Sequence, residues 1–309
     1  MPNIGFNRHI SVLTAIRPKI LEQKFFEISI ADYIPIVVGE DAWSDSILFQ
    51  NSIYTGSDFE QSLVGYSASD QLLATSNVGL VSQTVPVMPF ANTTGWTIHE
   101  LNTYARGTGN SLLEQKSKSQ KKVWDLGIQK VAFIGLLSNP NVTGLLNNPF
   151  VTNDTVTIPK KISAMTAKEF NTFLKSVLAK YYQNSGSTDA SPNRFVIPMS
   201  DYLGLVEPYS ESESKARITL MYDAFKMATG RKDFEIKGVA YGDSNNNGLG
   251  VNRYVMYNTN DETLQMDIPV PFQFLAPETS NNFSMNQVAV GQFTGVTVRR
   301  PQQVLYFSH

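Results

Sequence analysis

The closing stretch of the chain, residues 252–309, constrains the fold more than any other part of the sequence. Apolar residues alternate with other residues in two runs separated by a turn of Asn, Thr, Asp and Glu; the alternating apolar positions are Val255, Tyr257, Leu264, Met266 and Ile268. Period-two patterning broken by Asn- and Asp-rich turns is typical of antiparallel strands with one buried face. The chain ends in strand-like residues, 304–307, and a terminal strand is normally paired into a sheet. The sequence therefore predicts that this stretch completes a sheet.

The composition limits the classes of function. With 309 residues, of which 42% are hydrophobic, the chain can bury a sizeable core. Its formal net charge of −2 argues against a protein that grips nucleic acid, although it does not exclude one that encloses it. The chain has no cysteine and three histidines, which excludes thiolate metal sites and nearly excludes histidine chemistry. Neither a signal peptide nor an apolar run of about 18 residues is present, so we expect assembly in the cytoplasm and no membrane contact.

Residues 46–92 are predicted to form a long β-hairpin. Two strand-like ends, residues 47–54 and 79–88, flank a middle rich in Ser, Gly, Asp and Gln. Between Ser44 and Phe90 the sequence has acids but no Lys or Arg; the acids are Asp45, Asp58, Glu60 and Asp70. A hairpin this long with charge of one sign cannot bury itself, so we expect it to reach a partner surface.

A long helix is predicted from Ser111 to about Phe133. Ser111 and Glu114 form a capping box, in which both side chains satisfy backbone N–H groups at the start of the helix. The first half is polar and basic and the second half apolar; the lysines of the first half are Lys116, Lys118, Lys121 and Lys122. We therefore expect a helix that crosses the subunit surface, is buried at one end only, and ends at Gly135.

Residues 166–241 are predicted to form a compact α/β unit. A second capping box, Thr166 and Glu169, opens an amphipathic helix. Its apolar residues share one face, and they are Phe170, Phe173, Leu174, Val177 and Tyr181. Three elements follow: a strand at 194–199, a helix at about 210–229 with Gly230 as its C-cap, and a strand at 234–241.

No group of residues in the chain indicates catalysis or a bound metal. Residues 243–248 match the first half of a calcium-binding loop, but Tyr254 occupies the twelfth position, where a Glu is expected. One carboxylate holds Ca²⁺ poorly, so we interpret this stretch as a polar turn. His99 and Glu100 are neighbours, but no recognisable nucleophile lies near them in the sequence. We therefore expect no catalytic residue, no metal and no cofactor.

The lysines of residues 116–122 allow three interpretations. A run of charge on a helix is usually a solvated face. Alternatively, the lysines meet the acidic hairpin of a neighbouring copy, because complementary charges favour docking. Contact with nucleic acid is the third interpretation, and the net charge of the chain disfavours it.

The order of elements resembles the Hong Kong 97-type fold of tailed-bacteriophage major capsid proteins, an α+β fold that bacterial encapsulins share. An arm, a long hairpin, a crossing helix, an α/β unit and returning strands follow one another along the chain. The stretches that carry the resemblance are WTIHELNTYARGTGNSLLEQK (96–116), KVAFIG (130–135), NVTGLLNNP (141–149), NRYVMYNTNDETLQMDIPVPFQF (252–274) and GVTVRRPQQVLYF (295–307).

The resemblance implies names for the parts of the chain. These are an N-terminal arm (1–45), an extended loop (46–92), a peripheral domain (93–164) with a spine helix at about 110–134, an axial domain (165–250), and closing strands (251–309) that return to the axial and peripheral sheet.

The resemblance also implies a function. Copies of the chain would assemble into pentamers and hexamers of an icosahedral head shell around double-stranded DNA, without sequence-specific binding. The protein would be part of the virion, would assemble in the cytoplasm of the bacterial host, and would meet portal, scaffolding and decoration or cement proteins. The expected inter-subunit contact residues are Asp58, Glu60, Asp70, Lys116, Lys118, Lys121, Lys122, Arg299 and Arg300.

Two features depart from some members of the family. Those members link subunits through a Lys in the extended loop, and this loop has none, so we expect a shell without that cross-link. Others begin with a long helical scaffolding segment, for which there is no room before Ile4. Either it has been removed or scaffolding is a separate chain, and the Met1 start leads us to expect the second. Two alternatives stay open: an encapsulin-type shell, and an α/β enzyme with an unrecognised site in residues 166–241.

Overall fold

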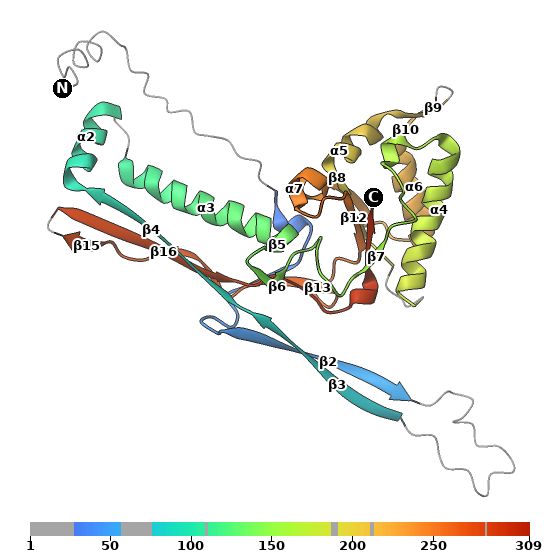
Figure 1. Cartoon of the computed structure of the whole chain (residues 1–309), viewed down its shortest axis with the longest axis horizontal. Helices are drawn as coiled ribbons and strands as arrows, with labels where there is room; N and C mark the ends of the chain where they lie inside the picture. Colours follow the sequence, from blue (N-terminus) through green and yellow to red (C-terminus); the bar gives the residue numbers. More distant parts are fainter. Residues whose placement is uncertain (1–27, 57–75, 109–110, 187–190, 211–212, 282) are drawn as a thin grey trace, which may run out of the picture. The chain divides into compact units, whose positions relative to one another are not determined.

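The structure is a computed structural model that describes residues 28–56, 76–108, 111–186, 191–210, 213–281 and 283–309 (Figure 1). The chain divides into two compact units. The first unit comprises Met1–Ser29, Pro89–Gln129 and Pro271–Gly291, and the second comprises Ile30–Met88, Lys130–Val270 and Gln292–His309. Among the described residues, no helix is long and apolar enough to cross a membrane.

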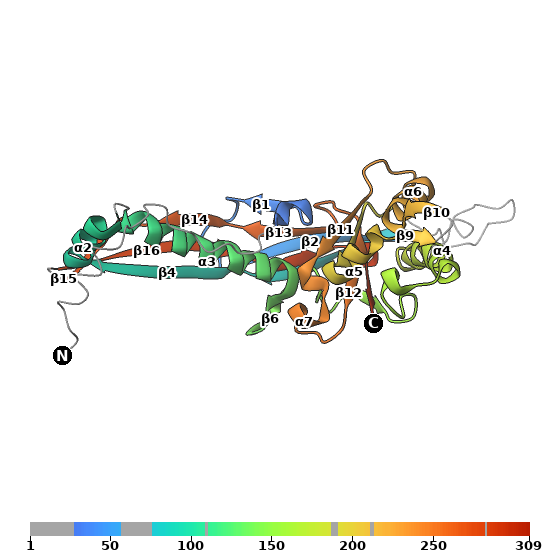
Figure 2. The same cartoon turned by 90° about the horizontal axis from the view of Figure 1, so that it is seen from above.

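The first unit contains a sheet built around one long strand, β16. This strand pairs with β4, β14 and β15. The strands are β4 (Met88–Thr97), β14 (Val270–Phe274), β15 (Glu278–Asn281) and β16 (Ser284–Phe293). The helices are α2 (Ile98–Thr108) and most of α3 (Leu112–Ile134). Figure 2 shows α3 running along β4 and β16.

Trp124 packs α3 onto this sheet. Its ring centre lies 5.1 Å from that of Phe90 in β4 and 5.8 Å from that of Phe272 in β14. The ring also lies directly over Gly291 in β16, where a Cβ atom would come within 2.6 Å of it. A larger residue than glycine at this position would therefore push the helix away from the sheet.

The ends of α3 follow local sequence signals. Ser111 Oγ accepts a hydrogen bond from the Glu114 backbone N–H (3.4 Å), as expected of the helix start. The helix stops before Gly135, whose φ of +79° suits glycine. The expectation of burial at one end only is wrong, because Leu112 and Gln120 in the first half are also buried. The Gln120 amide bonds backbone carbonyls of β4 and β16, at 3.1 and 3.3 Å, which draws this half of the helix onto the sheet.

A five-stranded mixed sheet forms the centre of the second unit. Its strand order is β11-β8-β12-β18-β7. The strands are β7 (Thr152–Asp154), β8 (Arg194–Pro198), β11 (Glu235–Val239), β12 (Arg253–Tyr257) and β18 (Val304–Ser308). β8 and β11 are parallel, as a strand–helix–strand crossover requires, whereas β12 runs antiparallel to both β8 and β18. The C-terminal strand is therefore paired into a sheet, as predicted.

Two helices cover one face of this sheet. They are α4 (Ala167–Asn184) and α6 (Arg217–Thr229). The predicted capping box of α4 is confirmed, since Thr166 and Glu169 each satisfy the other's backbone N–H. Three helix residues, Phe170, Val177 and Phe225, are fully buried in one cluster. The cluster also contains residues of β8, β11, β12 and β18.

The prediction that the closing strands have one buried face is wrong for β12 and β18. Tyr254 and Phe307 face the helices, but Tyr257 and Tyr306 on the opposite face are buried as well. Tyr257 donates a hydrogen bond to the Tyr33 carbonyl (2.7 Å), and Tyr306 donates one to the Leu145 carbonyl (2.7 Å). Segments distant in the sequence thus cover the second face.

The predicted start of the helix at residue 210 is also wrong. Residues before Arg217 form two short strands, β9 (Pro208–Ser210) and β10 (Glu213–Ala216), which pair antiparallel. Pro208 cannot donate a backbone hydrogen bond, and the Ser- and Glu-rich residues after it lack the apolar spacing of a buried helix. The end is as predicted, because Gly230 adopts the left-handed C-cap conformation (φ +67°).

Smaller elements complete the second unit. A three-stranded sheet has the order β1-β13-β17, and β2 and β3 form a separate hairpin, as do β5 and β6. The strands are β1 (Ile36–Val38), β2 (Ser46–Gly56), β3 (Ser76–Pro86), β5 (Gly135–Leu136), β6 (Asn139–Thr143), β13 (Leu264–Ile268) and β17 (Val296–Val298). The short helices are η1 (Ile30–Asp32), η3 (Ile162–Ala164), α5 (Met199–Tyr202), η4 (Leu203–Val206), η5 (Ala240–Gly242), α7 (Ser244–Asn247) and η6 (Pro301–Gln303).

The stretch that matched half of a calcium loop forms the helical turn α7. Asn247 is buried, and its amide donates to the carbonyl oxygens of Gly242 (3.4 Å) and Val251 (2.8 Å). Asp243 accepts a hydrogen bond from the Ser200 backbone N–H (3.3 Å). The polar residues of this turn therefore hold the backbone together. Among the described residues, no three or more acidic or histidine side chains lie together in a way that could hold a metal ion.

Candidate subunit-contact surfaces

The β2–β3 hairpin is the first candidate surface for contact with another chain. Its strands pair antiparallel over their full 11 residues, and neither pairs with any other described strand. The predicted strand pairing is confirmed, whereas the tip with Asp58, Glu60 and Asp70 lies outside the described residues. Its exposed apolar side chains include Leu48, Val78, Leu80 and Val81. Because an isolated two-stranded ribbon is only marginally stable, these side chains point to a covering partner.

Arg299 and Arg300, predicted to contact another subunit, make contacts within their own chain. The Arg299 guanidinium lies 4.3 Å from the ring centre of Phe49 in β2, and the Arg299 carbonyl accepts a hydrogen bond from Asn51 Nδ2 (3.4 Å). These contacts fix the base of the hairpin to the end of β17. Arg300 pairs with Glu262 at 2.7 Å on the surface, where such pairs add little stability. A role of either arginine between subunits stays a prediction.

Lys116 and Lys118 of the α3 cluster are paired with acids of their own chain. Lys116 Nζ lies 2.9 Å from Glu100 Oε1 and donates to a backbone carbonyl of β4 at 2.6 Å. The Lys116 hydrogen bond is the main cause that lowers the pKa of the Glu100 carboxyl below its ordinary value. Lys118 pairs with Glu114 one turn away (3.3 Å). The predicted contact of the cluster, which includes Lys121 and Lys122, with a neighbouring copy stays a prediction.

Most strands of the first unit's sheet carry no charged residue, the exception being β15 with Glu278. β4, β14 and β16 contain no Asp, Glu, Lys or Arg. Along β4 every second side chain is exposed, and these residues are Pro89, Ala91, Thr93, Gly95 and Thr97. Exposed protein surface carries roughly 25–35% charged residues, so an uncharged sheet face favours contact with another protein.

This uncharged face was not predicted, although the sequence carries a signal for it. No Asp, Glu, Lys or Arg occurs between Asp70 and Glu100. Between Asp267 and Arg299, Glu278 is the sole charged residue. The missed signal was the distribution of charge along the chain, in addition to an overall charged fraction of 17%, which is below the roughly 25% typical of soluble domains.

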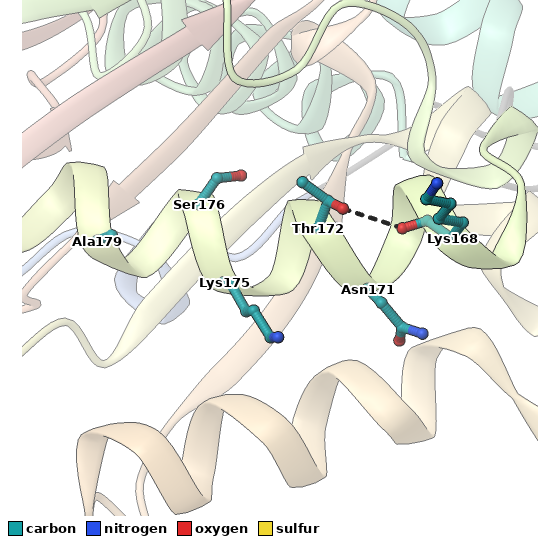
Figure 3. Close-up of a pocket in the computed structure, with 6 residues that line it drawn as sticks. All are labelled: Lys168, Asn171, Thr172, Lys175, Ser176 and Ala179. Carbon is teal, nitrogen blue, oxygen red and sulfur yellow. Dashed lines mark hydrogen bonds between the residues drawn. The ribbon is translucent and has the colours of Figure 1, made fainter.

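An open hollow of about 420 Å³ lies on the outer side of α4, and Figure 3 shows the residues that line it. Residues of this one helix line it, and they are Lys168, Asn171, Thr172, Lys175, Ser176 and Ala179. They share the side of the helix opposite the buried Phe170 and Val177. The lining offers amines, hydroxyls and an amide, but no carboxylate or imidazole that would act as a general base for a nucleophile.

The fully buried Asp201 in α5 is a structural group. Its carboxylate accepts hydrogen bonds from the backbone N–H groups of Ile162 and Ser163 (2.8 Å each) and from the Tyr254 hydroxyl (2.7 Å). Burial, with a further contribution from this carboxylate, raises the pKa of Tyr254 well above its ordinary value, so its hydroxyl remains a donor. Asp201 therefore ties η3 to β12 inside the α/β unit.

Comparisons with known proteins find similarity in sequence and in structure over most of the chain. A sequence model of the major capsid protein family matches residues 63–308. No curated protein sequence matches the chain. The capsid of Myoviridae phage XM1 is similar in structure, with a TM-score of 0.79 and 13% identity over 96% of this chain and 97% of that one.

Two further solved structures are similar over nearly their full length. A Mycobacterium phage Bobi structure gives a TM-score of 0.63 and 10% identity over 97% of both chains. A virus-like particle from Pyrococcus furiosus gives 0.52 and 12% identity over 91% of this chain and 92% of that one. These similarities, together with the match to the family, confirm the expected α+β fold of the Hong Kong 97 type.

Proposed function

The chain belongs to the major capsid protein family, and on this basis we propose that its copies form the pentamers and hexamers of an icosahedral head shell around phage double-stranded DNA. The family implies a structural role rather than catalysis. A net charge of −2 suits a wall that encloses DNA without gripping it, because packaging and release both need weak contact with the contents.

The observation that carries this proposal is a pair of uncovered surfaces. The β2–β3 hairpin exposes apolar side chains, and β4 in the first unit's sheet exposes uncharged ones. Neither surface carries a Lys or Arg side chain, so one can cover the other without burying a positive charge. We infer that the hairpin of one copy lies on a neighbouring copy, with the acids Asp58, Glu60 and Asp70 directed at lysines of α3. Symmetry repeats each contact, so individually weak contacts suffice for a closed shell.

This proposal gives a role to each part of the chain. The N-terminal arm would be residues 1–45, the extended loop 46–92, the peripheral domain 93–164 with α3 as its spine helix, the axial domain 165–250, and the closing strands 251–309. The shell would belong to the virion and would assemble in the host cytoplasm. Portal, scaffolding and decoration or cement proteins would be its further partners.

Negative-stain electron microscopy of the purified protein, with size-exclusion chromatography, tests the proposal. We expect closed shells or rings of five and six copies, either from the chain alone or after addition of a phage scaffold. A compact monomer or dimer under every salt condition and with scaffold would overturn it. Mature particles should run as a monomer near 34.3 kDa on a denaturing gel, because the extended loop has no lysine for a cross-link. Nucleic acid inside supports a head shell, whereas a protein cargo would indicate an encapsulin.

A further inference from the structure

Strands β12 and β18 are joined at one end by a pair of residues that lie directly beside them, Asn252 and His309. The backbones of the pair exchange two hydrogen bonds, from Asn252 N–H to the His309 carbonyl (3.0 Å) and from His309 N–H to the Asn252 carbonyl (3.3 Å). The side chains also meet, with Asn252 Nδ2 at 3.1 Å from His309 Nε2. This pair therefore closes one end of the β12–β18 ladder.

The orientation of the Asn252 amide decides which ring nitrogen of His309 carries the proton. The backbone N–H of Ser244, the first residue of α7, donates to Asn252 Oδ1 at 3.0 Å. A backbone N–H can only donate, so the amide oxygen must face Ser244 and the amide NH₂ group must face the imidazole. His309 Nε2 is therefore an acceptor, and the neutral ring carries its proton on Nδ1.

The second ring nitrogen lies in a buried position. His309 Nδ1 is shielded from solvent and has no hydrogen-bond partner among the described residues. The Tyr254 ring in β12 lies against the imidazole, with 5.6 Å between the ring centres and 33° between the ring planes. The Tyr254 hydroxyl donates to the Asp201 carboxylate instead (2.7 Å). Within the described part of the chain, the imidazole is thus hydrogen-bonded through Nε2 alone.

The surroundings of the imidazole favour its neutral form. Burial is the main cause that lowers the pKa of His309 below its ordinary value of 6.5. Asp201 in α5 opposes the fall, whereas Lys161, directly before η3, reinforces it. The Asp201 carboxylate is engaged elsewhere, since it accepts hydrogen bonds from Tyr254 and from two backbone N–H groups.

A proton on Nε2 would leave the charged ring without an acceptor at either nitrogen. Nε2–H would point at the N–H of the Asn252 amide, and this amide cannot turn without losing its bond to Ser244. Nδ1–H lacks a partner among the described residues in either state of the ring. Because a buried charge without a partner costs far more than a buried neutral ring, protonation should drive the imidazole out of its site.

We propose that His309 is an acid-sensitive contact that holds the end of β18 and the α7 turn on β12. Near neutral pH the unprotonated Nε2 accepts the Asn252 amide N–H, and the same amide holds the first residue of α7. In acid, Nε2 takes up a proton from solvent, the ring leaves, and the Asn252 amide is released with it. The result is a local opening of residues 243–252 and 304–309. This response goes beyond the proposed shell function, because every group involved lies in the second unit of one chain.

Hydrogen–deuterium exchange of the full chain, read by mass spectrometry, tests the contact between pH 7 and about pH 5, the range in which histidines change charge. After correction for the effect of pH on the chemical exchange rate, we expect peptides from residues 243–252 and 304–309 to exchange several-fold faster at the lower pH. Peptides from α4 should keep their rate. Since the folded state binds the proton less tightly than the unfolded chain, the stability that His309 contributes is present above pH 6.5 and is lost as the pH falls.

Two variants and a matched control sharpen the test. His309→Gln offers an amide oxygen to Asn252 but has no group to protonate, so its acid opening should disappear. Asn252→Asp offers one carboxylate oxygen to Ser244 and the other to the protonated ring, so its opening should shift to lower pH or vanish. His99→Gln, which changes an exposed histidine on α2, should open as the original chain does.

Three results would overturn the proposal. They are the absence of acid opening in the original chain, an opening of His309→Gln equal to that of the original chain, and a proton uptake by His309 at or above pH 6.5. The last is measured in the same samples through the slow exchange of the imidazole C2–H, which follows the protonation of each histidine separately. Exchange is read peptide by peptide whether or not copies assemble, so failure of the chain to form shells counts against the proposed function and leaves this test intact.

Discussion

The two main sheets of this protein differ in how their faces are covered. In the five-stranded sheet of the second unit, α4 and α6 cover one face, and Tyr33 and Leu145 bond side chains on the other. In the first unit, α3 covers one face of the sheet, and the exposed residues of β4, none of them charged, lie on the other. The five-stranded sheet is thus covered on both faces within one chain, whereas the β4 residues of the other sheet are exposed, and the proposed function assigns their cover to another copy. Substitutions in the five-stranded sheet should therefore disturb folding, and those on the uncharged face or the hairpin should disturb assembly.

Deletion of the hairpin tip, residues 56–72, should give the largest effect. The β2–β3 ribbon is separate from the other sheets, so the subunit should keep its circular dichroism spectrum and Tm. Assembly should be lost, because the acidic tip would no longer reach a neighbour. Electron microscopy and size-exclusion chromatography check the result. If the deletion variant formed shells like those of the full chain, the hairpin tip would not be needed for assembly.

Phe195→Ala should give the largest effect on folding. Phe195 is fully buried in β8, with its ring centre 6.0 Å from that of Phe225 and 6.4 Å from that of Tyr254. Removing a buried ring costs about 3–5 kcal/mol of the free energy of unfolding, measured by urea denaturation. The matched control, Leu80→Ala, changes a side chain that is 70% exposed on the hairpin and should stay within about 0.5 kcal/mol. Equal costs for both variants would contradict the comparison of the two regions.

Thr93→Lys should weaken assembly without weakening the fold. Thr93 is exposed on β4, so the subunit should stay within about 0.5 kcal/mol of its original stability. If a neighbour covers the face, the ammonium group is buried without a partner, and a cost of about 1.4 kcal/mol per contact raises the concentration needed for assembly about tenfold. Light scattering against protein concentration measures this. Thr172→Lys, on the charged outer side of α4, is the control, and equal behaviour of the two variants would mean that the β4 face stays in water.

Charge reversal of Lys121 and Lys122 to Glu should have a smaller effect that depends on salt. If these lysines face the acidic hairpin of a neighbour, assembly should weaken several-fold at low ionic strength. The difference from the original chain should shrink at high salt, because ions screen charges separated by more than about 10 Å at 0.1 M. Turbidity or light scattering across a salt series measures it. No change at low salt would identify the cluster as a solvated face.

Local signals in the sequence were sufficient to predict several elements. The capping box at Thr166 and Glu169 and the C-cap at Gly230 depend on residues a few positions apart, and both are confirmed. The hairpin strands also follow from nearby residues, because β2 and β3 pair in continuous register. Where side chains and turn residues act on their own neighbours, the sequence alone is a reliable guide.

Distant contacts explain what the sequence did not predict. The second buried face of β12 depends on Tyr33, which lies 224 positions from its hydrogen-bond partner Tyr257. The intrachain partners of Lys116 and Arg299 likewise come from other elements. The candidate contact surfaces were harder to predict from the sequence than the elements, because a face can be recognised as uncovered only when the covered faces are known.

The smallest expected effect concerns a buried carboxyl in the central strand of the three-stranded sheet. Asp267 in β13 is 5% exposed; Oδ1 accepts a hydrogen bond from Gln265 (2.7 Å), and Oδ2 has no partner among the described residues. Burial, reinforced by Glu40 and Asp41 after β1, raises the pKa of Asp267, while the Gln265 hydrogen bond and Arg299 oppose the rise. A raised pKa means that the folded state binds a proton more tightly than the unfolded state.

The sign of the pH dependence follows from this difference. Between the ordinary Asp value of 3.8 and the raised pKa of Asp267, the folded protein holds the proton and the unfolded chain does not, so stability falls as pH rises through this window. Asp267→Asn removes the charge and should therefore stabilise the subunit at pH 7, by less than about 1 kcal/mol because the amide loses the attraction of Arg299. The gain should vanish below pH 3.8.

Glu169→Gln is the control with the opposite sign, because Lys160 is the main cause that lowers the pKa of Glu169 to about 2. The Glu169→Gln variant should be less stable than the original chain at pH 7, and the difference should shrink as the pH falls toward 2. Urea denaturation at pH 3 and 7 measures both, and a loss of stability for Asp267→Asn at pH 7 would mean that the carboxylate is held by its surroundings and that the three-stranded sheet is as complete within one chain as the five-stranded sheet.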